Sequence, residues 1–141
     1  MITLNNTSDM QAGQGFTLET LQSVFSRILL ALIFVLSGLS KLAAPAAIQG
    51  YMQAMGVPTG LFYPTIVFEI ASGLLIILGY QTRVVAYLLA AFCLVSAAIF
   101  HHNFADQNET VNFLKNLSMA GGFLLLARVG AGSFSLDAWR H

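Results

Sequence analysis

The stretch LFYPTIVFEIASGLLIILG, residues 61–79, decides the fold because it is long and apolar enough to cross a bilayer. At about 1.5 Å rise per residue, a helix of this length reaches about 28 Å, close to the thickness of a hydrocarbon core. Glu69 interrupts the apolar pattern about 12 Å inside the span, where an unpaired charge costs several kcal/mol. The sequence therefore predicts a transmembrane helix and a partner for Glu69 elsewhere in the chain.

Three further apolar stretches, at about residues 24–42, 84–100 and 111–129, predict helices that also span the membrane. Between the first two spans, Ala46–Met55 repeats apolar residues at spacings of three and four, which predicts a short helix at the membrane interface. The short turn at residues 80–83 makes the second and third spans an antiparallel hairpin. The predicted fold class is all-α: an integral membrane protein built as a four-helix transmembrane bundle.

The regions outside the spans are short and polar. Residues 1–20 are predicted to form a disordered tail, and residues 131–141 a short C-terminal tail in which Trp139 is an interfacial anchor. Residues 21–130 then form one membrane domain without an internal repeat.

The composition agrees with a membrane protein and excludes several other classes. Hydrophobic residues make up 57% of the chain and charged residues 9%, against about 25% charged in ordinary soluble domains. The formal net charge is zero, so nothing indicates nucleic-acid binding. The single cysteine, Cys93, excludes an internal disulfide and is interpreted as a packing residue. His101 and His102 lack a thiolate or a spaced third ligand, so no metal site is predicted.

The basic residues predict the orientation of the chain. They divide unevenly between the two membrane sides, with Arg27, Arg83, Arg128 and Arg140 on the side of the termini and Lys41 and Lys115 on the other. Because basic residues favour the cytoplasmic side, we expect a multi-pass protein with both termini in the cytoplasm. The polar, interfacial arginines Arg27, Arg83 and Arg128 have two interpretations: they snorkel to anionic headgroups, which we favour, or they form a docking surface for a soluble partner.

Four ionisable residues are predicted to lie in the outer half of the bundle: Lys41, Glu69, His101 and Lys115. One interpretation is a structural ion pair of Glu69 with either lysine. The other is a polar pocket, open to the outer leaflet, that binds a quinone carbonyl while Glu69 or His101 exchanges protons. The residues alone leave both open.

Helical spacing also predicts which residues share a face. One face carries Glu69, Ser72, Gly73 and Ile76, and another carries Lys115, Ser118, Met119 and Gly122. Small residues let transmembrane helices approach closely, so helix contacts are predicted at Gly38, Gly73, Gly121 and Gly122.

Several of these segments, taken in order, resemble one known family. They are Arg27, SGLSKL at 37–42, FEIASG at 68–73, GYQTR at 79–83, FHHNF at 100–104 and KNLSMAGGFLLL at 115–126. From about Leu21 to Val129 the chain resembles the DoxX family of small four-span bacterial membrane proteins. The resemblance implies a bacterial inner-membrane protein whose polar core comprises Arg27, Lys41, Glu69, Arg83, His101, Lys115 and Asn116.

The resemblance also implies a function, because related DoxD proteins are a subunit of a thiosulfate:quinone oxidoreductase. We therefore expect a quinone-interacting subunit of a membrane oxidoreductase complex, with no covalently bound cofactor, a partner subunit in the lipid bilayer, and scope for homo-oligomers. The chain carries no haem-ligand pair or nucleotide motif, so the redox centre would be the quinone or a partner's cofactor. The alternative is a noncatalytic scaffold that stabilises or recruits a partner protein.

Overall fold

The computed structural model describes residues 16–141, and these residues form helices and loops without a strand. The elements, in order, are α1 (Leu18–Ala43), α2 (Pro45–Ala54), a 3-10 turn η1 (Thr59–Leu61), α3 (Phe62–Leu78), α4 (Thr82–Phe100), α5 (Gln107–Val129) and α6 (Leu136–Trp139). The predicted all-α fold class is confirmed, including the short helix between the first two long ones. A single proline, Pro64, lies in the first turn of α3, where its missing N–H is tolerated.

The predicted disordered tail, residues 1–20, lies mostly outside the described residues. Its last part is wrong, because α1 already begins at Leu18. The hydroxyl of Thr17 accepts a hydrogen bond from the backbone N–H of Thr20 at 3.2 Å and caps the helix. The predicted start of this helix at residue 24 was late because the first turns of α1 are amphipathic rather than wholly apolar.

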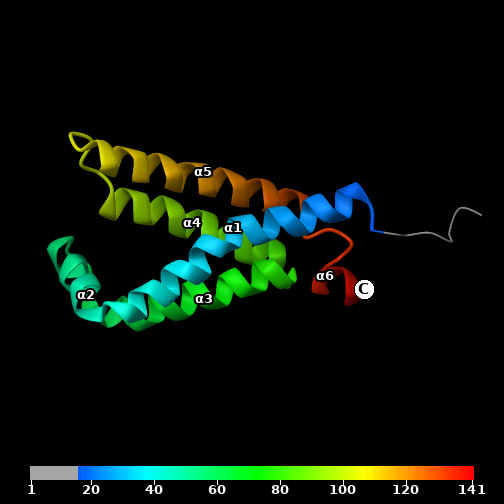
Figure 1. Cartoon of the computed structure of the whole chain (residues 1–141), viewed down its shortest axis with the longest axis horizontal. Coiled ribbons are helices and arrows are strands. Elements are labelled where there is room, and N and C mark those ends of the chain that lie inside the picture. The colour runs from blue at the N-terminus through cyan, green and yellow to red at the C-terminus, as the bar shows by residue number, and fades with distance from the viewer. Residues whose placement is uncertain (1–15) are drawn as a thin grey trace, which may run out of the picture.

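The four long helices pack as two pairs, α1 along α3 and α4 along α5 (Figure 1). The pairs meet near α6 and diverge toward the end where α2 lies. Where they meet, Phe34 of α1 packs edge-on against Phe123 of α5, with ring centroids 5.5 Å apart. Cys93 is fully buried in the same core, as its interpretation as a packing residue requires. Although α3 and α4 follow each other through a tight turn, each packs mainly against another helix.

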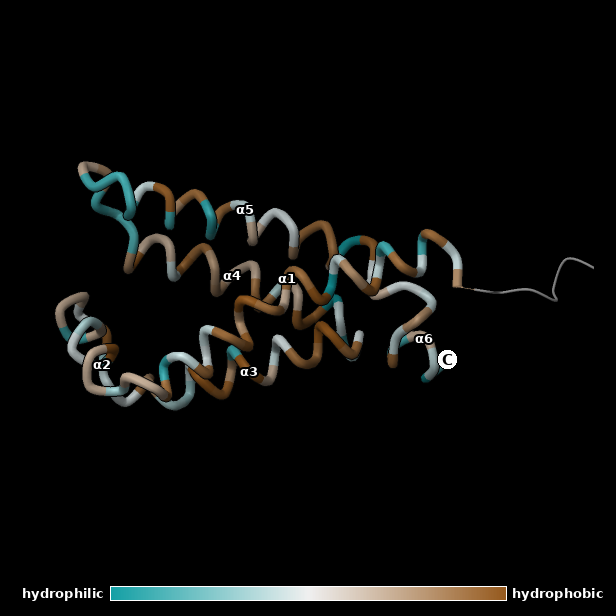
Figure 2. The backbone as a smooth tube through the Cα atoms, in the orientation of Figure 1, coloured by the Kyte–Doolittle hydropathy of each residue, from teal (hydrophilic) through white to brown (hydrophobic). Residues whose placement is uncertain are grey.

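Within residues 16–141, three helical segments are long and apolar enough to cross a membrane: Leu18–Ala43, Thr59–Leu78 and Thr82–Phe100. Their outer faces expose large apolar side chains such as Leu29, Val67 and Leu88, which suits contact with lipid. The helix α5 has the length of a span, but polar residues in its first half, Lys115 and Asn116 among them, lower its hydropathy (Figure 2). Its close packing along α4 places it beside an apolar span.

Glycines form most of the predicted helix contacts. A Cβ atom at Gly38 would lie 2.5 Å from the Ile70 side chain, and one at Gly73 would lie 2.7 Å from Val35, so α1 and α3 approach closely through both. Gly122 likewise faces α1. The prediction for Gly121 was wrong, because nothing lies within 4 Å of a Cβ built there.

Candidate functional site

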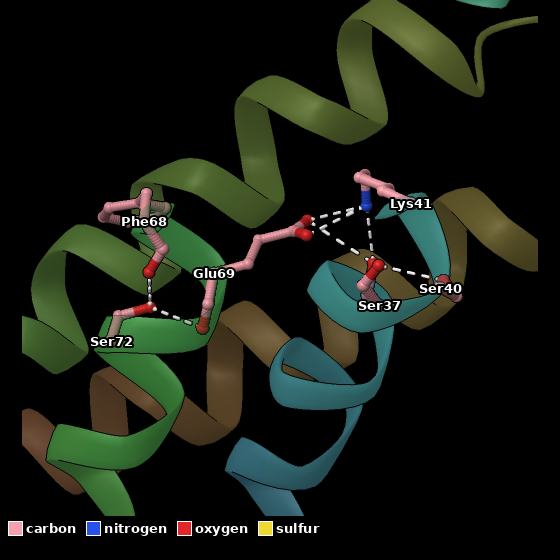
Figure 3. A network of polar contacts seen from close by, with 6 residues as sticks. All are labelled: Ser37, Ser40, Lys41, Phe68, Glu69 and Ser72. Carbon is pink, nitrogen blue, oxygen red and sulfur yellow. Dashed lines mark hydrogen bonds and ion pairs between the residues drawn. The ribbon is translucent and has the colours of Figure 1, made fainter. Parts of the chain in front are cut away.

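The central polar feature is an ion pair between the last turn of α1 and the middle of α3 (Figure 3). The Nζ atom of Lys41 lies 3.0 Å from Oε1 and 2.9 Å from Oε2 of Glu69. Lys41 also donates to the hydroxyl of Ser37 at 2.6 Å. Only 4% of Glu69 is exposed. Of the two lysines that sequence spacing allowed as partners, the structure therefore selects Lys41.

Every N–H of the Lys41 ammonium has an acceptor, and one of these acceptors can be replaced. The three N–H donors of the Lys41 ammonium point to three oxygen atoms, two from Glu69 and one from Ser37. The side chain of Lys41 is 21% exposed, whereas that of Glu69 is 5% exposed. A carbonyl oxygen entering from the exposed side could replace Ser37 as an acceptor without leaving Glu69 unpaired.

Glu69, Ser72, Gly73 and Ile76, which were predicted to share one helix face, are all buried. Ser72 does not join the ion pair. Its hydroxyl donates to the carbonyl of Phe68 at 2.5 Å, within the same helix (Figure 3). Ser72 is thus a buried polar neighbour that leaves the carboxylate untouched, which makes it a useful control position.

His101 belongs to a different site from Glu69. Its Nδ1 atom is 2.9 Å from Oε2 of Glu109, across the loop between α4 and α5. Nearby, the hydroxyl of Tyr51 on α2 donates to the carbonyl of Phe100 at 3.0 Å, which ties α2 to the end of α4. Burial, and to a smaller extent the negative charge of Glu109, raise the pKa of Tyr51, so its phenol keeps the proton it donates.

Lys115 and Asn116 are also separate from the ion pair. Lys115 lines a cavity between α1 and α5, and Ser118 and Met119 of the same predicted face line it too. Asn116 donates to the carbonyl of Asn112 at 3.0 Å, inside its own helix. The four ionisable residues of the predicted pocket, together with Asn116 of the predicted polar core, therefore lie in three places, and only Lys41 and Glu69 share a direct contact.

Arg27 is not an interfacial arginine, contrary to the favoured prediction, because only 1% of it is exposed. Its guanidinium donates to the carbonyl of Ile77 at 2.8 Å and to that of Phe134 at 2.6 Å. The first bond satisfies a free carbonyl at the end of α3, and the second ties down the segment that leads to α6. Gly79 adopts a left-handed φ of 70°, and a Cβ atom there would lie 2.5 Å from the guanidinium.

Two further side chains cap helix ends in the same region. Arg83 donates to the carbonyls of Ala127 at 3.1 Å and Arg128 at 2.6 Å, at the end of α5. Asp137 accepts hydrogen bonds from the backbone N–H groups of Gln81 at 2.7 Å and Thr82 at 2.9 Å, at the start of α4. We call Arg27, Arg83 and Asp137 the helix-end clasp. Of the three predicted interfacial arginines, Arg83 and Arg128 are exposed, and only Arg27 is buried.

Sequence reasoning missed Ser37 and Asp137. A signal for Asp137 was present, because the turn before α4 offers no capping side chain of its own at Gln81. A helix start without a local cap requires an acceptor from elsewhere, and Asp137 is the carboxylate of the C-terminal segment. Ser37 carried no such signal, since serine is common in transmembrane helices at close contacts.

Protonation of Asp137 is expected to release the C-terminal segment from the clasp at acid pH, and the fluorescence of Trp139 can report this change. Burial raises the pKa of Asp137, but the hydrogen bonds from Thr82 and Gln81 and the charge of Arg140 outweigh it, so the net pKa lies below the ordinary 3.8. Because the pKa of Asp137 is lower in the folded chain than in the unfolded chain, its ionised carboxylate stabilises the clasp fully above pH 3.8. This stabilisation is lost as the pH falls through the lower pKa of the folded chain. We expect the fluorescence anisotropy of Trp139, the only tryptophan, to drop below about pH 4.

The control for this transition is Asp137→Asn, which has no carboxylate to titrate at the start of α4. Its Trp139 anisotropy should be low already at neutral pH and flat on acidification. A variant that repeats the wild-type acid transition would show that another carboxylate controls the segment.

Among residues 16–141, no three histidine, cysteine, aspartate or glutamate side chains gather closely enough to hold a metal ion.

Comparisons with known proteins identify the family. The DoxX family profile matches residues 23–102, which include both residues of the buried ion pair. Inner membrane protein YqjF of Escherichia coli K12 is 42% identical over 120 residues, covering 85% of this chain and 92% of YqjF. Inner membrane protein YphA of the same organism is 37% identical over 121 residues, covering 81% of this chain and 86% of YphA. No solved structure matches the chain. The chain is a membrane protein that belongs to the DoxX family.

Proposed function

We propose that this DoxX protein binds a quinone at the Lys41–Glu69 pair and serves as a subunit of a membrane oxidoreductase complex. The observation that carries the proposal is the pair itself, because ionisable residues inside membrane spans are costly and usually mark functional sites. Because Lys41 is partly exposed, a polar head group can reach its ammonium, whereas Glu69 is buried beneath it.

The chemistry of the pair suits a quinone head group. The ammonium of Lys41 can donate a hydrogen bond to a quinone carbonyl in exchange for Ser37. The Glu69 carboxylate can accept a proton from a quinol as it is oxidised, and the protonated Glu69 can give that proton to a quinone as it is reduced. The chain would supply binding and proton transfer, and a redox centre on a partner subunit would supply or take the electrons.

The proposal includes a placement in the inner membrane, which the names of the two relatives support. It also takes α5 as the fourth span, because α5 packs along α4 for most of its length. With four spans, both termini lie on one side, and the distribution of basic residues favours the cytoplasm. Labelling of a cysteine introduced at Ala47 and at Asp106 from the outside tests this orientation.

The decisive experiment compares Glu69→Gln with the control Ser72→Ala. Each protein is purified in native lipid, and the quinone that accompanies it is measured by mass spectrometry. We expect wild type and Ser72→Ala to retain quinone and Glu69→Gln to lose at least nine-tenths of it, because the amide cannot hold Lys41 in the same geometry. Equal retention in all three proteins would contradict the proposal.

A second candidate function is a noncatalytic scaffold, and one observation favours it. The Lys41–Glu69 pair is satisfied without a ligand, and neither of the two described cavities is lined by either residue. A scaffold would keep its protein partners in Glu69→Gln and lose them when exposed charges such as Arg128 are removed. Co-purification of partners from both variants separates the two functions.

A further inference from the structure

A groove between α1 and α5 has the lining expected of a site for a lipid-like molecule. Its volume is about 730 Å³, within the range of small-molecule sites. Leucine, isoleucine, valine and methionine side chains form most of its wall, and Ser26, Ser118 and Lys115 are its polar residues. The groove lies apart from the Lys41–Glu69 pair, since neither residue lines it.

Lys115 is the single charged group in this groove, and it is unmatched. Lys115 makes no ion pair with the residues that the structure describes. Lys41, the lysine of the other polar site, is by contrast paired with Glu69. A lysine on a membrane helix without a partner is costly unless it reaches the interface or meets an anion. Lys115 lies four positions after Val111, where the apolar part of α5 begins, so its backbone is only about 6 Å below that level.

The sequence argues against a second copy of the chain as the source of that anion. Of the six acidic residues, only Glu69 lies in the interior of an apolar span, since Glu19 is in the first turn of α1. Glu69 is buried and paired with Lys41. Glu109, the nearest acid along α5, is in the first turn of the helix and bonds with His101. A second copy therefore has no free carboxylate at the depth of Lys115, whereas an anionic phospholipid places a phosphate within reach of a lysine just below the interface.

We infer that the α1–α5 groove binds one anionic phospholipid, with its phosphate at Lys115 and an acyl chain along Leu29 and Ile33. Ser118, one turn from Lys115 on the same face, donates its hydroxyl hydrogen to the carbonyl of Leu114 at 3.0 Å, so the charge of Lys115 is the contact that holds the phosphate. This site requires α5 to lie in the bilayer as proposed above, but it is independent of quinone binding.

The test reconstitutes the full chain into bilayers of equal parts phosphatidylglycerol and phosphatidylcholine. The protein is then extracted into mild detergent, and the lipids that remain are counted by native mass spectrometry. We expect wild type to retain one phosphatidylglycerol per chain. Lys115→Gln should lower that retention about five- to tenfold, the loss expected for one charge-assisted contact near the membrane surface.

Two variants separate a built site from general charge attraction. Arg128→Gln removes the same charge from the same helix, at an exposed position outside the groove, and should retain the lipid as wild type does. Ile33→Trp keeps every charge but fills the groove from a half-exposed position, and should lose the lipid while the protein melts normally.

Three results would overturn the inference: equal retention by wild type and Lys115→Gln, equal losses in Lys115→Gln and Arg128→Gln, or full retention in Ile33→Trp. A lipid-free dimer that dissociates in Lys115→Gln would also overturn it, by assigning the groove to a second copy. Because quinone content is measured separately, failure here leaves the proposed function untouched, and the converse holds as well.

Discussion

Arg27→Ala is expected to abolish stable folding, with a loss of more than about 4 kcal/mol. Arg27 is buried and donates charge-assisted hydrogen bonds to the ends of two separate segments, each worth roughly 1.5–3 kcal/mol. Alanine would leave the carbonyls of Ile77 and Phe134 without their donor and would open a cavity beside Gly79. Thermal melting in detergent and the amount of protein in the membrane fraction measure the effect.

Two matched variants sharpen this prediction. Arg128→Ala removes an exposed arginine side chain at the end of α5 and should leave the melting temperature unchanged. Arg27→Lys keeps the charge but replaces a fork of donors with a point charge that cannot serve both carbonyls in the same way, so it should recover only part of the stability. If Arg27→Ala melts like wild type, Arg27 does not hold the bundle together.

The second large effect is expected at the Lys41–Glu69 pair. Lys41→Met leaves the buried Glu69 carboxylate uncompensated, which costs about 3–5 kcal/mol when a buried pair is broken. Glu69→Leu leaves the partly exposed Lys41 without its partner and should cost less. The double variant Lys41→Met/Glu69→Leu removes both charges and fills the space with apolar side chains. We expect it to be more stable than either single variant, since replacing both members of a buried pair is often neutral or stabilising.

This double variant also separates stability from function. It should melt close to wild type and yet retain no quinone, because it has neither the donor nor the carboxylate. Additive losses in the double variant would show that Lys41 and Glu69 are not coupled. Normal quinone binding by a well-folded double variant would assign the pair a structural role alone.

The parts of the fold that were predictable from the sequence are those set by local composition. Apolar runs located the long helices, and helical spacing placed Glu69 with Gly73 on a buried face. The same spacing placed Lys115 with Met119 on the face that lines the α1–α5 groove.

The choice of partners was not predictable, because it depends on which helices pack together. The predicted depths of the side chains in the bundle let Glu69 pair with either Lys41 or Lys115. Glu69 pairs with Lys41 because α1 packs against α3. The same limit applied to His101, whose contact with Glu109 depends on the shape of one loop. Arg27 was misplaced because α1 begins at Leu18, which puts Arg27 nine residues inside the helix rather than near its edge.

The helix-end clasp has a consequence for how the chain is made. Asp137 and the carbonyl of Phe134 follow all four long helices in the sequence, yet they complete contacts with Arg27 and with the start of α4. A ribosome releases Arg27 more than a hundred residues before its partner at Phe134, so the two helix pairs are inserted before they can be fastened to each other. A chain interrupted before Phe134 would keep the bond from Arg27 to Ile77 but would leave the other arm of the guanidinium without its acceptor.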